Sequence, residues 1–367
     1  MIYLDNGATS FPKPEAVNRA VAAAVAHAGN PGRGGYPAAM TAAKILYHCR
    51  ELAGAMFDCQ PEQVVLTANC TQGLNMAIRT LVKPGDRVVV SGFEHNAVTR
   101  PLRLLGAEVI PAGRRLFDWA DTLTAWADAM KAKPTAAIFT HVSNVFGYIL
   151  PVEELAALCR ERGVPFIVDA AQSAGILPVS LRAFGADFIA MPGHKGLLGP
   201  TGTGLLLCGR TPEVWAAGGT GSDSIRQEMP EFLPDRAEAG TANVPGAAGL
   251  AAGMEAVRRL GMANIAAREA REAARCARGL EKLGLEVFYG PHQSGTVSLR
   301  GKMDCETLAD LLGRRGIATR AGLHCAPLAH ESAGTLDTGT LRISFGHNAN
   351  RGQTQTLLRA MHNGIGK

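Results

Sequence analysis

The sequence predicts an α/β protein with a large domain on a seven-stranded, mostly parallel sheet and a smaller α+β domain. Between residues 64 and 208, short runs rich in Val, Ile and Leu alternate with longer stretches of helical periodicity. The runs lack strict alternation of apolar and polar residues, which is typical of strands covered on both faces. After residue 245 the pattern changes to two long helices followed by further strands and helices. A length of 367 residues suits two domains.

Each apolar run of the large domain predicts one strand. The runs cover residues 64–68, 87–91, 108–111, 136–141, 165–169, 187–191 and 204–208. Helices are predicted over residues 71–83, 95–105, 119–132 and 152–162. Asp118 and Pro151 stand where two of these helices begin. Because crossover helices connect the strands, most of the strands are expected to run parallel.

The smaller domain is predicted from the elements after residue 245. These are helices over 246–260, 263–283, 304–315 and 351–362, and strands near 286–289, 296–299, 317–320 and 341–345. No low-complexity linker separates the two parts, so we expect them to pack closely. Residues 15–245 are expected to form the large domain, and residues 1–14 with 246–367 the small one.

The charge pattern argues against a nucleic-acid-binding protein. The formal net charge is only +5 over 367 residues. The densest basic stretch, residues 268–278, contains four arginines, but Glu269 and Glu272 lie among them. Interspersed charges of this kind predict a solvated helix face rather than a basic stripe.

The sequence also gives no sign of a membrane span or a metal site. No window approaches 18 uninterrupted apolar residues, and the first residues lack the basic and apolar regions of a signal peptide. The eight cysteines include no Cys-x-x-Cys pair, and the ten histidines show no ligand spacing. Dispersed thiols suit a reducing compartment, so the cytoplasm is the expected location.

Polar segments follow five of the predicted strands. They are residues 69–73, 94–96, 141–144, 169–172 and 193–196. Ligands of open α/β sheets bind beyond the carboxyl ends of the strands. The five segments therefore predict one binding site at this edge of the sheet.

Asp169 and Lys195 are the most informative pair in these segments. Asp169 ends an apolar run, where a carboxylate needs a partner such as a pyridinium nitrogen. Lys195 follows the next strand in a glycine-rich turn, and an enclosed lysine can lose its proton and form an imine. Alone, Lys195 would be interpreted as an exposed turn residue. Together the two residues predict pyridoxal 5′-phosphate bound covalently by Lys195.

Two further segments resemble phosphate sites. At residues 69–73 the free backbone amides and the Thr71 hydroxyl predict an anion site, with a plain helix cap as the alternative. Residues 199–204 are rich in glycine but lack the Gly-Lys-Ser/Thr ending of a nucleotide-binding loop. We therefore reject a nucleoside triphosphatase.

Taken together, these segments resemble the class V aminotransferase family of fold-type I pyridoxal-phosphate enzymes. Within this family they are most similar to cysteine desulfurases and selenocysteine lyases. The resemblance runs from residues 3–10 to residues 341–345, nearly the whole chain. The other matching stretches are residues 29–31, 71–75, 94–96, 169–172 and 238–243.

The resemblance implies how the cofactor would be held. Lys195 would bind it covalently and move protons at the substrate α-carbon, while Asp169 would pair with the ring nitrogen. Gln172 would hydrogen-bond the ring hydroxyl, and His95 would stack on the ring as a further catalytic residue. The other cofactor contacts that the family implies are Thr71, Gln72, His194, Asn144 and, from a second subunit, Thr241. The family builds its site across the interface of a homodimer.

The resemblance also implies a substrate site and a nucleophile. Arg342 would grip the substrate carboxylate bidentately, with Asn144 and Arg320 beside it. Residues 320–327 look like the Arg-x-Gly-x-x-Cys-Ala loop of desulfurases whose nucleophile lies on a short loop. Cys325 would attack the sulfur of bound cysteine, leaving alanine and a persulfide. Cationic neighbours such as Arg320 and His324 favour a thiolate. A buried structural cysteine is the alternative interpretation.

Two departures from the family pattern leave the substrate and the sulfur acceptor open. Pro192 stands where relatives often have a hydroxyl residue, which removes one phosphate ligand and one N–H. Residues 328–335 carry ionisable groups of their own.

The sequence thus predicts a homodimeric cysteine desulfurase that acts on L-cysteine and passes its persulfide to an acceptor protein. A selenocysteine lyase acting on L-selenocysteine is the nearest alternative. Transamination, β-elimination or racemisation of another amino acid on the same Lys195 chemistry is the second. A catalytically silent scaffold is the third, since fold alone does not fix function.

Overall fold

A seven-stranded sheet forms the centre of the computed structural model, which describes residues 1–32 and 34–365. The strand order is β2-β8-β7-β6-β5-β3-β4. The strands are β2 (Val64–Thr67), β3 (Arg87–Ser91), β4 (Glu108–Ala112), β5 (Ala136–Thr140), β6 (Phe166–Asp169), β7 (Phe188–Pro192) and β8 (Gly204–Cys208). Strand β8 runs antiparallel to both of its neighbours, and the other pairs are parallel. The predicted mostly parallel sheet of seven strands is confirmed.

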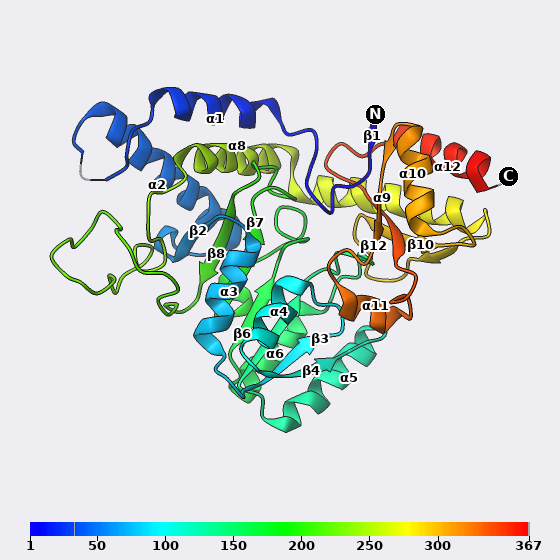
Figure 1. Cartoon of the computed structure of the whole chain (residues 1–367), viewed down its shortest axis with the longest axis horizontal. Coiled ribbons are helices and arrows are strands. Elements are labelled where there is room, and N and C mark those ends of the chain that lie inside the picture. Colours follow the sequence, from blue (N-terminus) through cyan, green and yellow to red (C-terminus); the bar gives the residue numbers. More distant parts are fainter. Residues whose placement is uncertain (33, 366–367) are drawn as a thin grey trace.

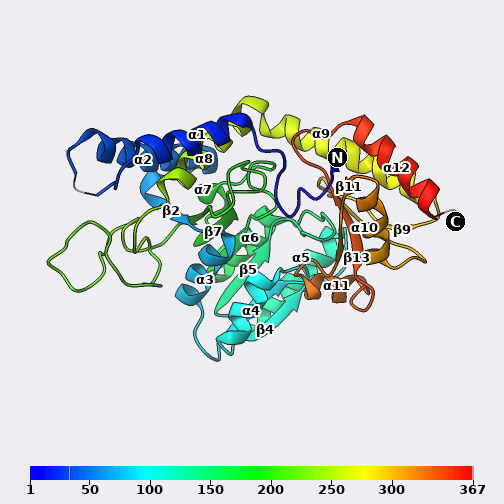
Figure 2. The same ribbon diagram turned by 45° about the horizontal axis from the view of Figure 1, so that its top comes forward.

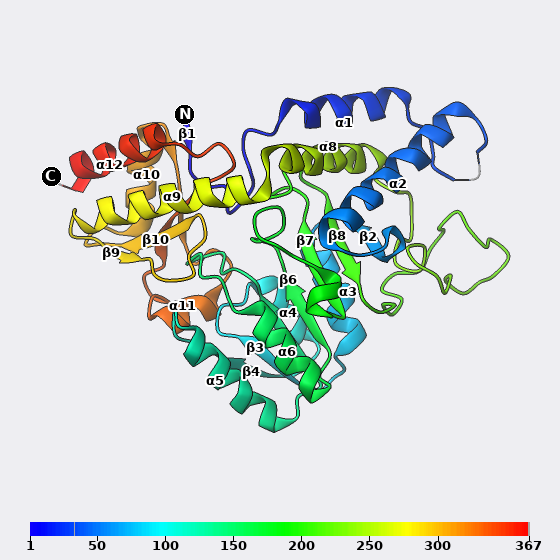
Figure 3. The ribbon, with the colours of Figure 1, turned by 180° about the vertical axis from the view of Figure 1, so that it is seen from behind.

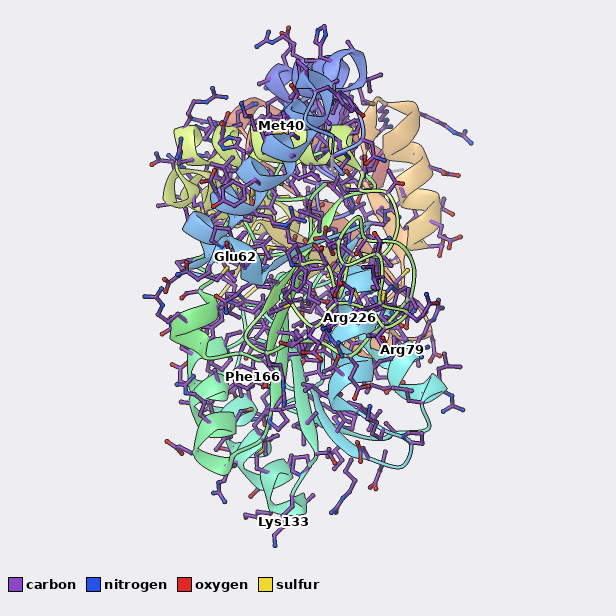
Figure 4. The ribbon with its side chains drawn as sticks, turned by 90° about the vertical axis from the view of Figure 1, so that its left-hand side faces the viewer. Met40, Glu62, Arg79, Lys133, Phe166 and Arg226 are labelled. Carbon is purple, nitrogen blue, oxygen red and sulfur yellow. The ribbon has the colours of Figure 1, made fainter. Side chains whose placement is uncertain are left out.

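Successive residues of each strand enter two different cores, which explains why the runs lack alternation. In β3, Val89 packs into the core on one face, while Val88 and Val90 pack into the core on the other. Figure 4 shows the sheet seen edge on, with helices on both sides and Phe166 at the start of β6. Strands covered on both faces need apolar side chains at every position.

Different sets of helices cover the two faces (Figures 1 and 3). One face carries α3 (Cys70–Leu81) and α4 (Asn96–Leu104). The helices of the other face are α2 (Pro37–Phe57), α5 (Trp119–Ala129), α6 (Val152–Arg162), α7 (Leu181–Phe184) and α8 (Val244–Leu260). Helix α1 (Glu15–His27) packs against α8, and two short 3₁₀ turns, η1 (Pro61–Gln63) and η2 (Met130–Ala132), complete this part.

A second, smaller sheet lies next to the first and is formed by strands between residues 286 and 344. Strands β9 (Glu286–Phe288), β10 (Thr296–Arg300), β12 (Arg320–Gly322) and β13 (Thr340–Ser344) form an antiparallel sheet in the order β12-β13-β10-β9. Strand β1 (Ile2–Tyr3) pairs with β11 (Ile317–Ala318), so both termini lie in this part (Figure 1). Its helices are α9 (Met262–Glu281), α10 (Cys305–Arg314), α11 (Pro327–Ala333) and α12 (Arg351–Ile365). The predicted strand at 317–320 is divided between two sheets.

Helix α8 connects the two parts of the chain. Its apolar residues, among them Leu250 and Met254, belong to the core of the large sheet, although its sequence was assigned to the small domain. The boundary at residue 245 stays a prediction, and this packing favours a boundary after α8. In α9, Arg268, Arg271 and Arg278 are exposed, as expected for a solvated face, but Glu269 and Glu272 are buried, so the prediction of interspersed charges on this face is wrong for the two glutamates.

Residues 209–243 connect β8 to α8 without forming a helix or strand. Figure 2 shows this segment extending away from the large sheet. It exposes large apolar side chains, namely Trp215, Ile225 and Phe232. Throughout residues 1–32 and 34–365, no helix has the length and apolar character needed to cross a membrane.

Candidate active site

A cavity of about 350 Å³ lies between the carboxyl edge of the large sheet and the small sheet. Ligand pockets of proteins commonly have volumes of about 300–1,000 Å³. The predicted site residues that line this cavity are Thr71, His95, Asn144, Asp169, Gln172, His194, Lys195, Arg320, Cys325 and Arg342. The residues come from both parts of the chain, so the site forms only when the two parts pack together.

Two predicted cofactor contacts lie elsewhere in the chain. Gln72 and Thr241 line a separate cavity of about 230 Å³. The side-chain carbonyl of Gln72 accepts a hydrogen bond from the Ala68 N–H at 2.7 Å. Within one chain, these two residues are not brought to the cavity that contains Lys195, and their roles stay predictions.

Asp169 ends β6 at the floor of the cavity and is only 3% exposed. Its Oδ1 accepts hydrogen bonds from the Ala171 N–H at 2.8 Å and from the Cys70 thiol at 3.6 Å. Its Oδ2 has no hydrogen-bond partner among the described residues, so one carboxylate oxygen remains available to a ligand. Burial raises the pKa of Asp169, and the Lys195 ammonium opposes this shift.

Lys195 follows β7 in the turn of residues 193–196 and faces Asp169 across the cavity. Its ammonium forms no hydrogen bond with any residue in the described part of the chain. Burial lowers the pKa of Lys195, and the charge of Asp169 partly restores it. A lysine with a lowered pKa reaches the neutral amine that forms an imine more readily.

The turn at residues 69–73 is a capped helix start. The Asn69 side chain accepts a hydrogen bond from the Gln72 N–H at 2.8 Å, which caps α3. Thr71 lines the cavity at this end of the helix. The helix cap is therefore present, and an anion-binding role for Thr71 stays a prediction.

Burial keeps two histidines of the cavity neutral. It lowers the pKa of His95 and of His194 to about 4. The His95 Nδ1 accepts a hydrogen bond from the Ala97 N–H at 3.0 Å, which leaves the proton on Nε2. The Nδ1 of His194 is buried without a partner among the described residues.

Asp5 holds both arginines that were predicted to bind substrate. The Arg342 Nη2 donates to its Oδ1 at 2.7 Å, and the Arg320 Nε donates to its Oδ2 at 3.0 Å. The two arginines are opposite each other in the β12–β13 pair, so their side chains share a face. Arg342 is 2% exposed and its Nε has no partner among the described residues.

Cys325 lies at the tip of a tight turn beside the cavity, and its side chain is exposed. The Ala326 N–H donates to the Leu323 carbonyl at 2.9 Å, and both central residues have positive φ, 49° at His324 and 58° at Cys325. The Asn96 N–H donates to the Cys325 carbonyl at 2.7 Å. The Asn144 side chain donates to the His324 carbonyl at 2.8 Å. Strained backbone of this kind persists only where its surroundings hold it.

Residues 328–335, which depart from the family pattern, support this turn. They form most of α11, and the His330 ring is fully buried, with its Nδ1 2.7 Å from the Thr335 hydroxyl. His330 also contacts the rings of His324 and Phe146. Pro192, the other departure, ends β7 and lines the cavity.

Sequence reasoning missed several residues that complete the site. Asp5 gave no local signal, because its two partners lie more than 300 positions further along the chain. Glu94 precedes His95 and is buried, and its carboxyl accepts hydrogen bonds from the Ser91 hydroxyl and the Thr140 N–H. Burial raises the pKa of Glu94 to about 8. A charged residue at the end of an apolar strand was the signal available for Glu94.

The polar atoms of the cavity fit pyridoxal 5′-phosphate. A free carboxylate oxygen of Asp169 suits a ring nitrogen, and the unpartnered Lys195 side-chain nitrogen, once it has lost its proton, suits a carbonyl carbon. The orphaned Nδ1 of His194, close to the start of α3, suits a phosphate oxygen. No group of three potential metal ligands occurs within the described residues.

This arrangement of sheet, small domain and lysine site is that of fold-type I enzymes. The chain belongs to the aminotransferase class-V family, whose family model matches residues 2–357.

Relatives of known name agree with this membership. A protein of Methanothermobacter thermautotrophicus named "Probable cysteine desulfurase" is 32% identical, over 94% of this chain and 90% of the relative. A "Cysteine desulfurase" of Escherichia coli O1:K1 is also 32% identical, over 89% of this chain and 84% of the relative. The solved apo structure of a cysteine desulfurase from Thermococcus onnurineus superposes with a TM-score of 0.90 at 30% identity, covering 99% of this chain and 94% of that one.

Proposed function

We propose that this chain is a cysteine desulfurase that converts L-cysteine into L-alanine and keeps the sulfur on Cys325 as a persulfide. The observation that carries the proposal is the exposed Cys325 thiol beside the cavity that also contains Lys195 and Arg342. The names of the relatives support the same activity. The reaction balances, because L-cysteine and the enzyme thiol together become L-alanine and an enzyme persulfide.

The residues of the cavity would hold pyridoxal 5′-phosphate as the family implies. Lys195 would bind it covalently, Asp169 would contact the ring nitrogen, and Gln172 the ring hydroxyl. The His95 ring would lie on its face. Thr71 and His194 would hold the phosphate at the start of α3. When bound, the cofactor withdraws electrons from the substrate α-carbon.

The chain's own residues would then position the substrate and move its protons. Arg342 would bind the substrate carboxylate next to Asn144, oriented by Asp5. Lys195 would take the α-proton and later return a proton to carbon. With its proton on Nε2, His95 would donate a hydrogen bond into the cavity.

Cys325 would act as the nucleophile on sulfur. Its thiolate attacks the substrate sulfur, so an S–S bond forms while the bond between the β-carbon and sulfur breaks. The electron pair of the broken bond stays on carbon, and a proton added there gives alanine. Asn96 and Asn144 hold the backbone carbonyls of Cys325 and His324, which would fix the turn that presents the thiol.

We further propose a cytoplasmic homodimer that hands its persulfide to an acceptor protein. The apolar side chains exposed by residues 209–243 support a protein interface, and Thr241 lies at the end of this segment. In such a dimer Thr241 would reach the phosphate site of the partner. Free thiols at all eight cysteines support a reducing compartment.

Product analysis tests the activity. The protein is incubated with L-cysteine, pyridoxal 5′-phosphate and a thiol reductant, and alanine, sulfide and pyruvate are quantified. We expect equal amounts of alanine and sulfide, because each turnover releases one of each. Cys325→Ser should lose sulfide release, and Lys195→Ala should lose the visible absorbance of the bound cofactor. Cys59→Ser, at a partly buried thiol outside the cavity, is the matched control.

The other outcomes identify other reactions. Pyruvate in place of alanine would indicate β-elimination, and sulfide release that survives in Cys325→Ser would overturn the role of Cys325. The same assay with L-selenocysteine compares the two substrates. Cofactor absorbance that is absent, or unchanged in Lys195→Ala, would favour a scaffold without this chemistry.

A further inference from the structure

The carbonyl oxygen of His194 is the most heavily used acceptor next to the site. It accepts hydrogen bonds from the Ser10 N–H at 3.0 Å, the Thr9 hydroxyl at 3.0 Å and the Ser10 hydroxyl at 3.1 Å. The Lys13 ammonium donates to it at 2.7 Å. This carbonyl belongs to the peptide that joins His194 to Lys195, so the N-terminal segment fixes the backbone from which Lys195 projects.

Lys13 differs from the other three donors because it carries a charge. Its ammonium also donates to the Ser10 hydroxyl at 2.7 Å. The side chain is half-buried, yet it forms no ion pair with a carboxylate in the described part of the chain. Charge-assisted hydrogen bonds are about twice as strong as neutral ones. A partly buried charge without a counter-ion is costly, so its position beside Lys195 calls for an explanation.

Other hydrogen bonds fix the turn before and after the His194–Lys195 peptide, whereas Lys13 bonds the peptide itself. The Gly193 N–H donates to the Thr203 carbonyl at 2.8 Å, which fixes the turn before His194. The Leu198 N–H donates to the Lys195 carbonyl at 2.9 Å, which fixes the turn after Lys195. Lys13 does not line the 350 Å³ cavity and therefore does not touch a ligand bound there.

We propose that Lys13 is a positioning residue, whose ammonium clamps the His194–Lys195 peptide and so directs the Lys195 side chain at the cofactor carbon. This inference rests on the proposed function, because it needs Lys195 to bind pyridoxal 5′-phosphate. The clamp is strong only while Lys13 is charged.

The surroundings of Lys13 define the pH at which the clamp weakens. Burial lowers the pKa of Lys13 to about 8. The titratable groups that interact with its charge are His194 in the turn after β7 and His347 before α12. Next to these, Lys195 follows His194 in the chain, and the Arg268 guanidinium of α9 bonds the His347 carbonyl. All four groups are basic. Lys13 is therefore charged below about pH 8 and loses its charge as the pH rises through that value.

A small cavity of about 40 Å³ next to this region is lined by an acidic side chain, Glu269. Glu269 lines it together with Ser10 and His347, and burial raises the pKa of Glu269 to about 8. Its ionisation would fall in the same pH range as that of Lys13. The comparison of Lys13 variants below separates the two, since Glu269 is present in all of them.

The test uses Lys13→Met, which removes the charge, and Lys13→Arg, which makes it permanent. Lys302→Met, at an exposed lysine far along the chain, is the matched control. At pH 7 we expect Lys13→Met to lower kcat about tenfold with little change in the KM for cysteine, the size of effect expected from one charge-assisted hydrogen bond. Cofactor affinity, measured by titrating each apoprotein and following absorbance, should fall by a similar factor. Lys302→Met should match the wild type in both.

The pH profile gives the readout that a purely structural role would not change. In the wild type, kcat should fall as the pH rises through about 8, because Lys13 loses its proton. Lys13→Arg should lack this alkaline decline, and Lys13→Met should be low throughout without a step near pH 8. If Lys13→Met does not fold, Lys13→Gln, which still donates to the His194 carbonyl without a charge, replaces it.

Three results would overturn the proposal. One is a Lys13→Met variant with wild-type kcat and cofactor affinity. Another is an alkaline decline that is identical in the wild type and in Lys13→Arg. The third is a loss of thermal stability in the Lys13→Met apoprotein with no loss of cofactor affinity. A failure of the proposed function looks different, because the wild type would then show no cofactor absorbance that depends on Lys195.

Discussion

At the scale of single residues, Asp5 organises the substrate side of the site. Its carboxylate bonds the buried Arg342 and the half-exposed Arg320 from two adjacent strands. Arg342 also donates to the Asn144 carbonyl at 2.9 Å, so its guanidinium plane is fixed before any substrate arrives. Preorganisation of this kind reduces the loss of freedom on binding.

Replacing Asp5 with Asn should therefore affect both stability and substrate binding. Breaking a buried ion pair leaves Arg342 without its counter-ion, so we expect the free energy of unfolding in urea to fall by about 3 kcal/mol. The KM for cysteine should rise, because the Arg342 guanidinium loses its orientation. Asp128→Asn removes an exposed pair with Lys131 and should cost less than about 0.5 kcal/mol. Equal effects of the two substitutions would contradict this account.

Sequence reasoning found the residues that lie next to strand ends and missed those that reach the site from far along the chain. Asp169 and Lys195 were predicted because an ionisable group directly after a buried apolar strand needs a partner or a function. Asp5 and Lys13 occupy a segment without such a run, and their partners are close only in the folded chain. His324 was named only as a neighbour of Cys325, although it lines the cavity itself.

At the scale of elements, burial decided what could be predicted. The seven strands of the large sheet are apolar at most positions on both faces, which marks them in the sequence. Strands β11 and β12 could not be distinguished in the sequence, because they follow each other with one residue between them. They differ only in their partner strands, which are β1 for β11 and β13 for β12. Helix α11 has seven residues, which is less than two full helical turns. A helical period cannot be recognised in so short a sequence. The antiparallel strand β8 is as apolar as the parallel strands of the sheet, so its direction could not be predicted from the sequence.

The cap of α3 is the element boundary with the clearest consequence. Asn69→Ala removes the acceptor for the Gln72 N–H, and the protein should lose about 1 kcal/mol of stability. Because this helix start faces the cavity, cofactor affinity should fall as well. Asp118→Ala removes the cap of α5, outside the cavity, and should cost the same stability without changing cofactor affinity. Urea unfolding and cofactor titration measure the two effects, and a loss of affinity in both variants would contradict the assignment.

At the scale of the whole molecule, buried histidines set the response to acid. Burial lowers the pKa of His95, His141, His194 and His330 to about 4, and of His324 to about 3. Free histidine titrates near 6.5, so the unfolded chain binds protons first as the pH falls. Buried Glu94 and Glu269 oppose this trend, since both bind protons more tightly in the folded state. The histidines outnumber them.

Stability should therefore decline as the pH falls from about 6.5 toward 4. Thermal unfolding of the apoprotein should have a lower midpoint at pH 5 than at pH 7. His141→Leu removes one of the groups and should reduce the slope of stability against pH by about 1.4 kcal/mol per pH unit. His27→Leu, on an exposed position of α1, is the matched control. A slope that is unchanged in His141→Leu would show that another group causes the acid sensitivity.

The position of the first strand has a consequence for how the chain is made. The Ile2 N–H donates to the Gly316 carbonyl, the Ser344 N–H donates to the Leu4 carbonyl, and Asp5 bonds Arg342. Closing a loop of this length is slow compared with forming local structure. During synthesis, β1 gains its partner strand only when β11 has left the ribosome, and Asp5 gains Arg342 only when β13 has followed. Substrate arginines and the Lys195 turn thus come together among the last events of folding, so a chain that stops before residue 344 carries the lysine without the site.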